Sequence, residues 1–266
     1  LLVNTGSASR IVELGEGAVL QNLEYDMGGN RWDTYTYYTY TTGFAAHVAD
    51  GTLRISGGVI QDFHVDGFYL DKGVSNAGHI NHAAILSLQG ANARLEMSAG
   101  AIRNNSLDVA YARFYGPTAS GNGYADGATG ILVANQGAQI DISGGSVEGN
   151  VLSGNKWSSP GYGSSNTGIY AHPVGVIALS AKAKMSLSGG NISGNENRIG
   201  VDGTAAGNVS YFSKMGIISL GYTYLVSDAP SFTMTGGTIT GNTATAGNGG
   251  GIYIHFNAGN VSISNA

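Results

Sequence analysis

The sequence has no cysteine, only 4 prolines among 266 residues, and charged side chains at just 11% of its positions. The absence of cysteine excludes disulfide bonds, thiolate metal ligands and a thiol nucleophile. A collagen-like chain is excluded because the 44 glycines fall short of one third and follow no three-residue period. The net charge of -5 offers no basic surface for nucleic acid or an anionic membrane, and no apolar run is long enough to cross a bilayer.

Hydrophobic residues make up 42% of the chain, which is enough apolar surface for a folded core. A six-residue motif recurs through it. It begins with an aliphatic residue or Met, continues with usually Ser or Thr, two small residues and one variable residue, and closes with an aliphatic residue. Its copies lie at 55–60, 97–102, 142–147, 187–192 and 234–239, with a degenerate first copy at 14–19. The closing residues are 41 to 47 positions apart, which is the period of a solenoid.

Each repeat contains three strand-like pieces, because its apolar residues alternate with a period of two. The first is an apolar run such as 176–179, the second alternates as Ile140 and Ile142 do around Asp141, and the third holds the closing aliphatic residue. Three strands per turn, each pairing with its copy about 4.8 Å away, predict an all-β parallel β-helix of about six to seven coils. The whole of 1–266 is predicted to form this single domain.

An asparagine follows the closing residue by three positions in most repeats. These residues are Asn22, Asn105, Asn150, Asn195 and Asn242, and Phe63 takes the place in the remaining repeat. Asparagine tolerates the left-handed backbone region and can hydrogen-bond along a stack of identical residues. We therefore predict a structural asparagine ladder at one corner, not a binding site.

Gly251, at the next first strand, follows Asn242 of this corner by 9 positions, but the equivalent distance is 21 to 25 positions in the other repeats. These long links carry most of the aromatic residues. We predict an aromatic ridge along the helix, formed by Trp32, Tyr35, Tyr37, Tyr40, Phe68, Tyr69, Tyr111, Tyr115, Trp157 and Tyr162. Two interpretations stay open: the rings pack together into a small secondary core, or exposed Tyr and Trp faces bind sugars or a protein.

Two classes of function are compatible with a β-helix, an enzyme and a binding protein. Glycoside hydrolysis needs two carboxylates about 5 to 9.5 Å apart, and among the outward strand positions only Glu96 and Asp141 are adjacent carboxylates. We interpret these two as charges of a solvated face. A polysaccharide-active lyase or glycoside hydrolase is therefore the alternative hypothesis, because a β-helix by itself assigns no activity.

Two sets of polar residues are candidates for a catalytic or metal site. The cluster of Asp62, His64, Asp66, Asp71 and Lys72 would suit an acid/base pair or a weak cation site, but it occurs once. His79 and His82 lack further ligands for a metal. The sequence predicts no catalytic residue, no metal and no cofactor.

The segments 189–195 (Gly-Gly-Asn-Ile-Ser-Gly-Asn) and 236–242 (Gly-Gly-Thr-Ile-Thr-Gly-Asn), with Gly-Gly-Gly-Ile-Tyr at 249–253, carry a resemblance. They resemble the repeats of bacterial polymorphic-outer-membrane-protein-type passengers and related Gly/Asn-rich surface adhesins. The resemblance covers the whole chain as scattered short motifs. It implies a right-handed β-helix, an extracellular or cell-surface location, and a role in adhesion or surface display.

No cap helix is predicted at either end, which leaves two hypotheses. The chain is part of a longer repeat array, or the last coil of one copy stacks on the first coil of the next and builds a filament. The sequence thus predicts an extracellular, non-catalytic protein for adhesion, surface display or self-assembly. Its expected partner is another copy, a glycan or a surface protein, with no nucleic acid and no membrane insertion.

Overall fold

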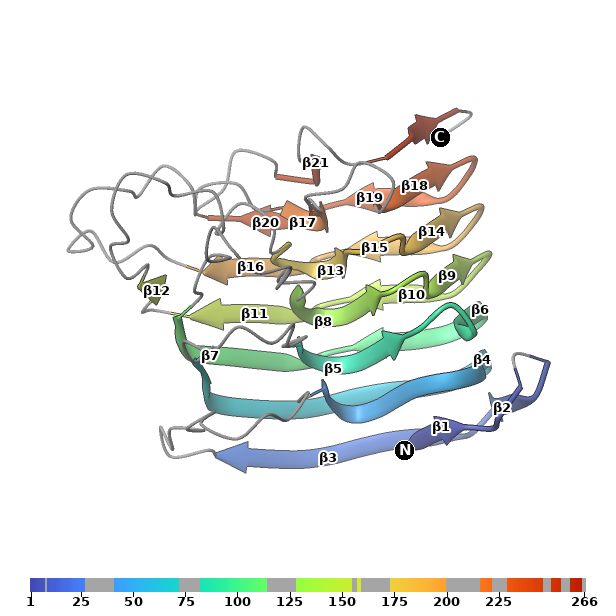
Figure 1. The fold of residues 1–266 in the computed structure, drawn as a ribbon, viewed down its shortest axis with the longest axis horizontal. Coiled ribbons are helices and arrows are strands. Elements are labelled where there is room, and N and C mark those ends of the chain that lie inside the picture. The colour runs from blue at the N-terminus through green and yellow to red at the C-terminus, as the bar shows by residue number, and fades with distance from the viewer. Residues whose placement is uncertain are drawn as a thin grey trace, which may run out of the picture.

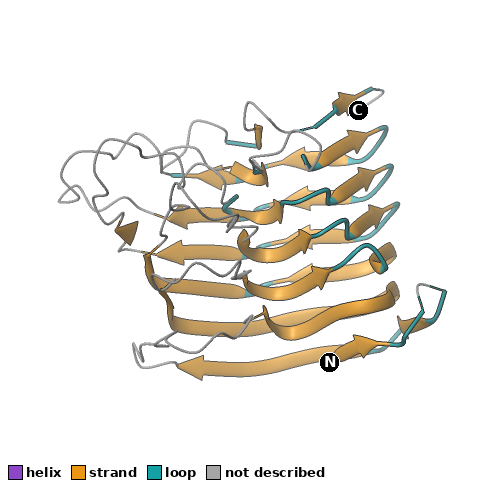
Figure 2. Ribbon diagram, in the orientation of Figure 1, coloured by secondary structure: helices purple, strands orange, loops and turns teal. Residues whose placement is uncertain are grey.

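A computed structural model describes most of the chain: residues 1–7, 9–26, 41–71, 82–113, 128–154, 157–158, 173–199, 216–221, 229–245, 250–254 and 259–264. Strands and turns account for this structure, and no helix is drawn in it (Figure 2). The described residues accordingly contain no helix able to span a bilayer.

The strands stack as successive turns of a parallel β-helix, with the N-terminal turn at one end and the C-terminal strands at the other (Figure 1). Each turn passes through four strand positions, which we number 1 to 4 in chain order. The strand β4 (Thr41–Asp71) runs through all four positions of the second turn. The predicted parallel β-helix is confirmed, and the described strands form six turns and the start of a seventh.

The other strands distribute over the positions as follows. Position 1 holds β1 (Leu2–Asn4), β5 (His82–Gln89), β8 (Ala128–Asn135), β13 (Gly175–Leu179), β17 (Gly216–Leu220) and β21 (Ile252–Ile254). Position 2 holds β2 (Ile11–Leu14), the start of β6 (Ala93–Arg103), β9 (Gln139–Ile142), β14 (Lys184–Leu187), β18 (Ser231–Met234) and β22 (Val261–Ile263). Position 3 holds the start of β3 (Val19–Asp26), the end of β6, β10 (Ser146–Glu148), β15 (Asn191–Ser193) and β19 (Thr238–Thr240). Position 4 holds the end of β3, β7 (Ser106–Arg113), β11 (Val151–Gly154), β12 (Trp157–Ser158), β16 (Glu196–Ile199) and β20 (Thr243–Ala244).

Position 4 was not predicted. The repeat pattern predicted that the regular structure ends at the asparagine corner and that everything beyond it belongs to long links. Instead the chain forms one more parallel strand after the corner, as in the pairing of Val151 with Ser106 and Glu196. The part of each link outside the stack is therefore shorter than predicted.

The core consists of aliphatic columns that run along the stack. Alternation in each strand turns every second residue inward, so residues such as Ile55, Ile142 and Leu187 lie one above another and are almost completely buried. Burial of each such side chain stabilises the fold by about 1.5–3 kcal/mol relative to full exposure. The same contacts recur at every turn, so the stack has one continuous hydrophobic core.

Glycines make the bend between positions 2 and 3. Gly100, Gly145, Gly190 and Gly237 have φ values of 80°, 78°, 84° and 82°. The turns also approach each other closely here: a Cβ atom placed on Gly100 would lie 2.0 Å from the carbonyl oxygen of Gly58. Both features require glycine, which explains its recurrence in the repeat.

The first turn departs from the predicted alignment. Leu20, not Val19, pairs with Ile60, while Leu14 pairs with Ile55. The first bend therefore has one residue more than the second. The same shift places Leu23 opposite Phe63, so Asn22 is one residue away from the asparagine column, and its assignment to the ladder was wrong.

Candidate functional site

Five long segments connect position 4 of one turn to position 1 of the next, and we call them the return segments. They are residues 27–40, 72–81, 114–127, 159–172 and 200–215. The structure describes the strands on either side. At the exits Asp71 pairs with Arg113, which pairs with Ser158, and at the re-entries His82 pairs with Thr41 and Ala128. These three exits and three re-entries are therefore about 4.8 Å apart from turn to turn. The described strands before the first and fifth segments end at Asp26 and Ile199, which pair with Asp66 and Gly154.

The predicted aromatic ridge falls mainly on these segments. Trp32, Tyr35, Tyr37, Tyr40, Tyr115 and Tyr162 lie outside the described residues. For Phe68, Tyr69, Tyr111 and Trp157 the structure describes the backbone, which belongs to position 4. Tyr69 pairs with Tyr111, and Trp157 pairs with Ala112, the next residue along. The backbones of these aromatic residues thus lie close to the exits in three successive turns.

The asparagine column is a hydrogen-bonded network inside the stack. The Asn150 side chain shows the pattern: Nδ2 donates to the Ile102 carbonyl oxygen at 2.9 Å and to Asn195 Oδ1 at 2.9 Å, while Oδ1 accepts from the Asn105 N–H at 3.1 Å. Equivalent bonds join Asn105, Asn195 and Asn242 to their neighbours. Asn105, Asn150 and Asn195 are completely buried. Their amides are fully used within the stack and are not free to bind a ligand.

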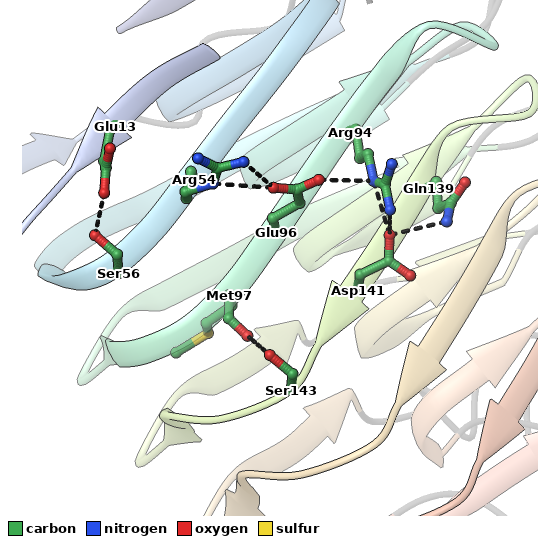
Figure 3. Close-up of polar contacts among 9 residues, drawn as sticks. All are labelled: Glu13, Arg54, Ser56, Arg94, Glu96, Met97, Gln139, Asp141 and Ser143. Atoms are coloured by element: carbon green, nitrogen blue, oxygen red, sulfur yellow. Dashed lines mark hydrogen bonds and ion pairs between the residues drawn. The ribbon is translucent and has the colours of Figure 1, made fainter. Parts of the chain in front are cut away.

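Charged side chains form a row across the outer face of position 2 (Figure 3). Arg54 contacts Glu96 at 2.7 Å through Nη2 and 3.0 Å through Nε. Arg94 bridges the next two turns, 3.3 Å from Glu96 and 2.7 Å from Asp141, and Gln139 donates to Asp141 at 2.8 Å. Ser56 donates to Glu13 at the N-terminal end of the row. Arg54 and Arg94 therefore neutralise the carboxylates of this row, and Glu96 and Asp141 are both paired with arginine.

We expect Glu96→Gln to lower the free energy of unfolding by about 1 kcal/mol or less, because the paired side chains remain partly exposed to water. The loss should disappear in about 1 M salt, where the charges are screened. Urea unfolding at low and high salt measures both effects. Ser186→Ala changes an outward residue of the same strand position that has no ion pair, and should be nearly neutral in both salts. A loss at Glu96 that persists in high salt would contradict this interpretation.

The polar cluster around His64 is dispersed along a strand. Asp62 has a φ of 58° and occupies the left-handed position that Asn104, Gly149, Gly194 and Gly241 occupy in later turns. It is therefore a turn residue. His64 Nδ1 lies 2.8 Å from Ser106 Oγ, and Asp66 is exposed. The backbones of Asp71 and His82 lie in strands, whereas Lys72 and His79 lie outside the described residues. No group of three potential metal ligands was found in the described part of the chain.

Position 1 has a second buried face that the repeat pattern did not predict. Ser87, Val133, Ala178 and Ser219 form a column in position 1 and are completely buried. Val133 and Ala178 belong to a small hydrophobic cluster that is separate from the main core. The strands β8, β13 and β17 are thus buried on both faces, as is usual for parallel strands. The available signal was that these runs are almost continuously apolar and do not alternate with polar residues.

Some polar groups on this face have unusual surroundings. Ser219 Oγ donates to the Val174 carbonyl oxygen at 2.7 Å and accepts from the Gly216 N–H at 3.0 Å. Ser87 Oγ and His47 Nδ1 are buried without a hydrogen-bond partner, and their backbones pair. Burial lowers the pKa of His47, so its ring is neutral at neutral pH. Burial likewise raises the pKa of Tyr253 in β21.

Comparison of this chain with protein families, with curated proteins and with solved structures finds no match in any of the three.

Proposed function

We propose that this protein is an extracellular, non-catalytic β-helix that displays its aromatic return segments for adhesion to a glycan or a surface protein. The observation that supports this is the registered stacking of the strands that follow the segments. In position 1, β5, β8, β13 and β17 pair in register from one turn to the next. A row of similar segments anchored at this spacing presents several weak contacts at once, and such contacts reinforce one another.

The composition of the segments suits this role. Residues 32–40 contain Trp32 and four tyrosines together with three threonines and one aspartate. Tyr and Trp offer a large contact area, one polar group and few rotatable bonds, so they bind flat sugar rings or protein surfaces with a small loss of entropy. The stem beneath them is held by buried aliphatic columns and by the asparagine network. A stem built in this way fixes the segment ends before a partner binds, which reduces the entropy lost on binding.

The arrangement of charges supports a non-catalytic stem. A general acid or base must exchange its proton with a substrate. Glu96 and Asp141, the adjacent carboxylates of the outer face, instead make short contacts with Arg54 and Arg94. Both carboxylates therefore have a structural explanation, because each forms an ion pair that stabilises the contact between two turns.

The proposal is tested by replacing Tyr35, Tyr37 and Tyr40 together with alanine. We expect binding to immobilised glycans or to a host cell surface to fall by about tenfold or more, because aromatic residues dominate such interfaces. The matched control replaces Thr34, Thr36 and Thr39 with alanine in the same segment and should retain binding. Circular dichroism establishes that both variants keep the β-helix.

Equal binding by both triple variants would contradict the role of these tyrosines. Release of soluble oligosaccharides from a bound polysaccharide would instead support the alternative, a polysaccharide-active lyase or hydrolase. The released products are measured by reducing-end and unsaturated-sugar assays on the same samples.

A further inference from the structure

One polar side chain joins the two ends of the return segment 200–215. Asn197 lies in β16 and is almost completely buried, at 2% exposure. Its Oδ1 accepts from the N–H of Ile199, the last described residue before the segment, at 3.3 Å. Its Nδ2 donates to the carbonyl oxygen of Gly216, the first described residue after the segment, at 3.1 Å. The exit and the re-entry are therefore held by the same amide group.

A second buried side chain holds the other backbone group of Gly216. The Ser219 hydroxyl accepts from the Gly216 N–H at 3.0 Å and donates to the Val174 carbonyl oxygen at 2.7 Å. Gly175, which pairs with Gly216, leaves room for this hydroxyl, because a Cβ atom on Gly175 would lie 2.9 Å from Ser219 Oγ. Gly216 is thus bonded on one side to the turn below through Asn197, and on the other side to Ser219 of its own strand.

Both side chains differ from those at the same places one turn below. Asn197 pairs with Leu152, and Ser219 pairs with Ala178. Neither a leucine nor an alanine side chain can form a hydrogen bond, so the return segment 159–172 lacks the equivalent link. Burial of an amide in an aliphatic column costs free energy unless its hydrogen bonds are made. The polar pair is therefore specific to the ends of the segment 200–215.

We propose that Asn197 and Ser219, here called the clamp, are positioning residues for the return segment 200–215. The clamp fixes the ends of the segment before a partner binds, which reduces the entropy lost on binding. The inference rests on the proposed display function, and the segment contains the adjacent aromatic residues Tyr211 and Phe212. The segment 200–215 thus meets a partner with a smaller entropy loss than the segment 159–172, which has no such link.

Trypsin cleavage of the full chain tests the clamp without a ligand. Asn197→Leu removes the amide and introduces the residue that the column holds one turn below. We expect the rate of cleavage after Lys214, within the segment, to rise by about tenfold or more, because two buried hydrogen bonds at the segment ends are lost. The rate of cleavage after Lys72, in another return segment, should be unchanged and serves as the reference in the same molecule.

Two further variants separate the clamp from general loosening of the stem. Ser219→Ala introduces the residue of the turn below, should also accelerate cleavage after Lys214, and takes the place of Asn197→Leu if that variant does not fold. Leu152→Val is the matched control, because it shortens a side chain of the same inward column and leaves the clamp intact. It should not change the ratio of the two cleavage rates. No rise after Lys214 in the clamp variants, or an equal rise after both lysines, would overturn the inference.

Binding separates this inference from the display function itself. On the immobilised glycans or cell surface that the wild-type chain binds, we expect Asn197→Leu to bind about threefold or more weakly, and Leu152→Val to bind as the wild type does. Unchanged binding of Asn197→Leu, with binding lost in the variant of Tyr35, Tyr37 and Tyr40, would overturn the positioning role while the display function stands. Absence of binding by the wild-type chain would contradict the display function, and the two cleavage rates would still test the clamp.

Discussion

Replacement of Gly100 by alanine should lower the free energy of unfolding by about 3–5 kcal/mol, a loss as large as those found for severe core substitutions. Two effects combine at this position. The backbone φ of 80° lies in the region that residues with a Cβ rarely adopt. The added Cβ would also lie 2.0 Å from the Gly58 carbonyl oxygen and 3.0 Å from the Gly57 carbonyl carbon. These are backbone atoms of the adjacent turn, so relief requires the two turns to separate.

Gly17→Ala separates the two effects, because this glycine in the bend of the first turn has a similar φ without the close approach. Its φ is 78°, and a Cβ atom there would have no heavy atom within 4 Å. We expect only the conformational penalty, about 1–2 kcal/mol. Urea unfolding followed by circular dichroism compares the two variants. Equal losses would show that the stacking contact contributes nothing and that glycine is required for its φ alone.

This steric requirement also explains why so much of the fold could be predicted from the sequence. A close approach at each bend forces small residues, and a buried column forces aliphatic residues, so both recur at the period of one turn. The motif at 142–147 carries both signals, and its strands fall where the alternation placed them. The spacing of these motifs was sufficient to align the second to sixth turns.

Position 4 could not be predicted because its inward residues are few and chemically mixed. In β16 the buried residues are Asn197 and Ile199, and in β11 they are Leu152 and Gly154. Asn197 is accommodated because its Nδ2 donates to the Gly216 carbonyl oxygen at 3.1 Å. A buried polar residue whose hydrogen-bond partner lies in a strand of the next turn cannot be recognised from the residues next to it in the sequence.

The candidate sites were predictable to different degrees for related reasons. The buried column from Asn105 to Asn242 follows the repeat spacing, whereas Asn22 follows a bend with one extra residue and so falls out of register. The pairing of Glu96 and Asp141 with arginines depends on which side chains of adjacent turns lie opposite each other. That information requires the register, which a single sequence supplies only where the motif is regular.

The interior of the asparagine column should be the polar feature most sensitive to substitution. We expect Asn150→Leu to lower the free energy of unfolding by about 3 kcal/mol or more, although leucine has a similar volume. The Asn105 N–H loses its acceptor, while Asn105 Nδ2 and Asn195 Oδ1 each lose one of their partners. All of these groups are buried, so water cannot replace the lost hydrogen bonds without opening the stack.

Asn242→Leu provides the matched comparison, because Asn242 makes the same contacts to the turn below but is itself only partly buried. Its replacement removes partners only from groups of the turn below, whereas Asn150→Leu also removes a donor from Asn195 Oδ1, so the loss should be smaller, about 1–2 kcal/mol. Urea unfolding of the two variants measures the difference. A larger loss at Asn242 than at Asn150 would mean that the column stabilises the fold chiefly by holding its last turn, not by satisfying buried groups.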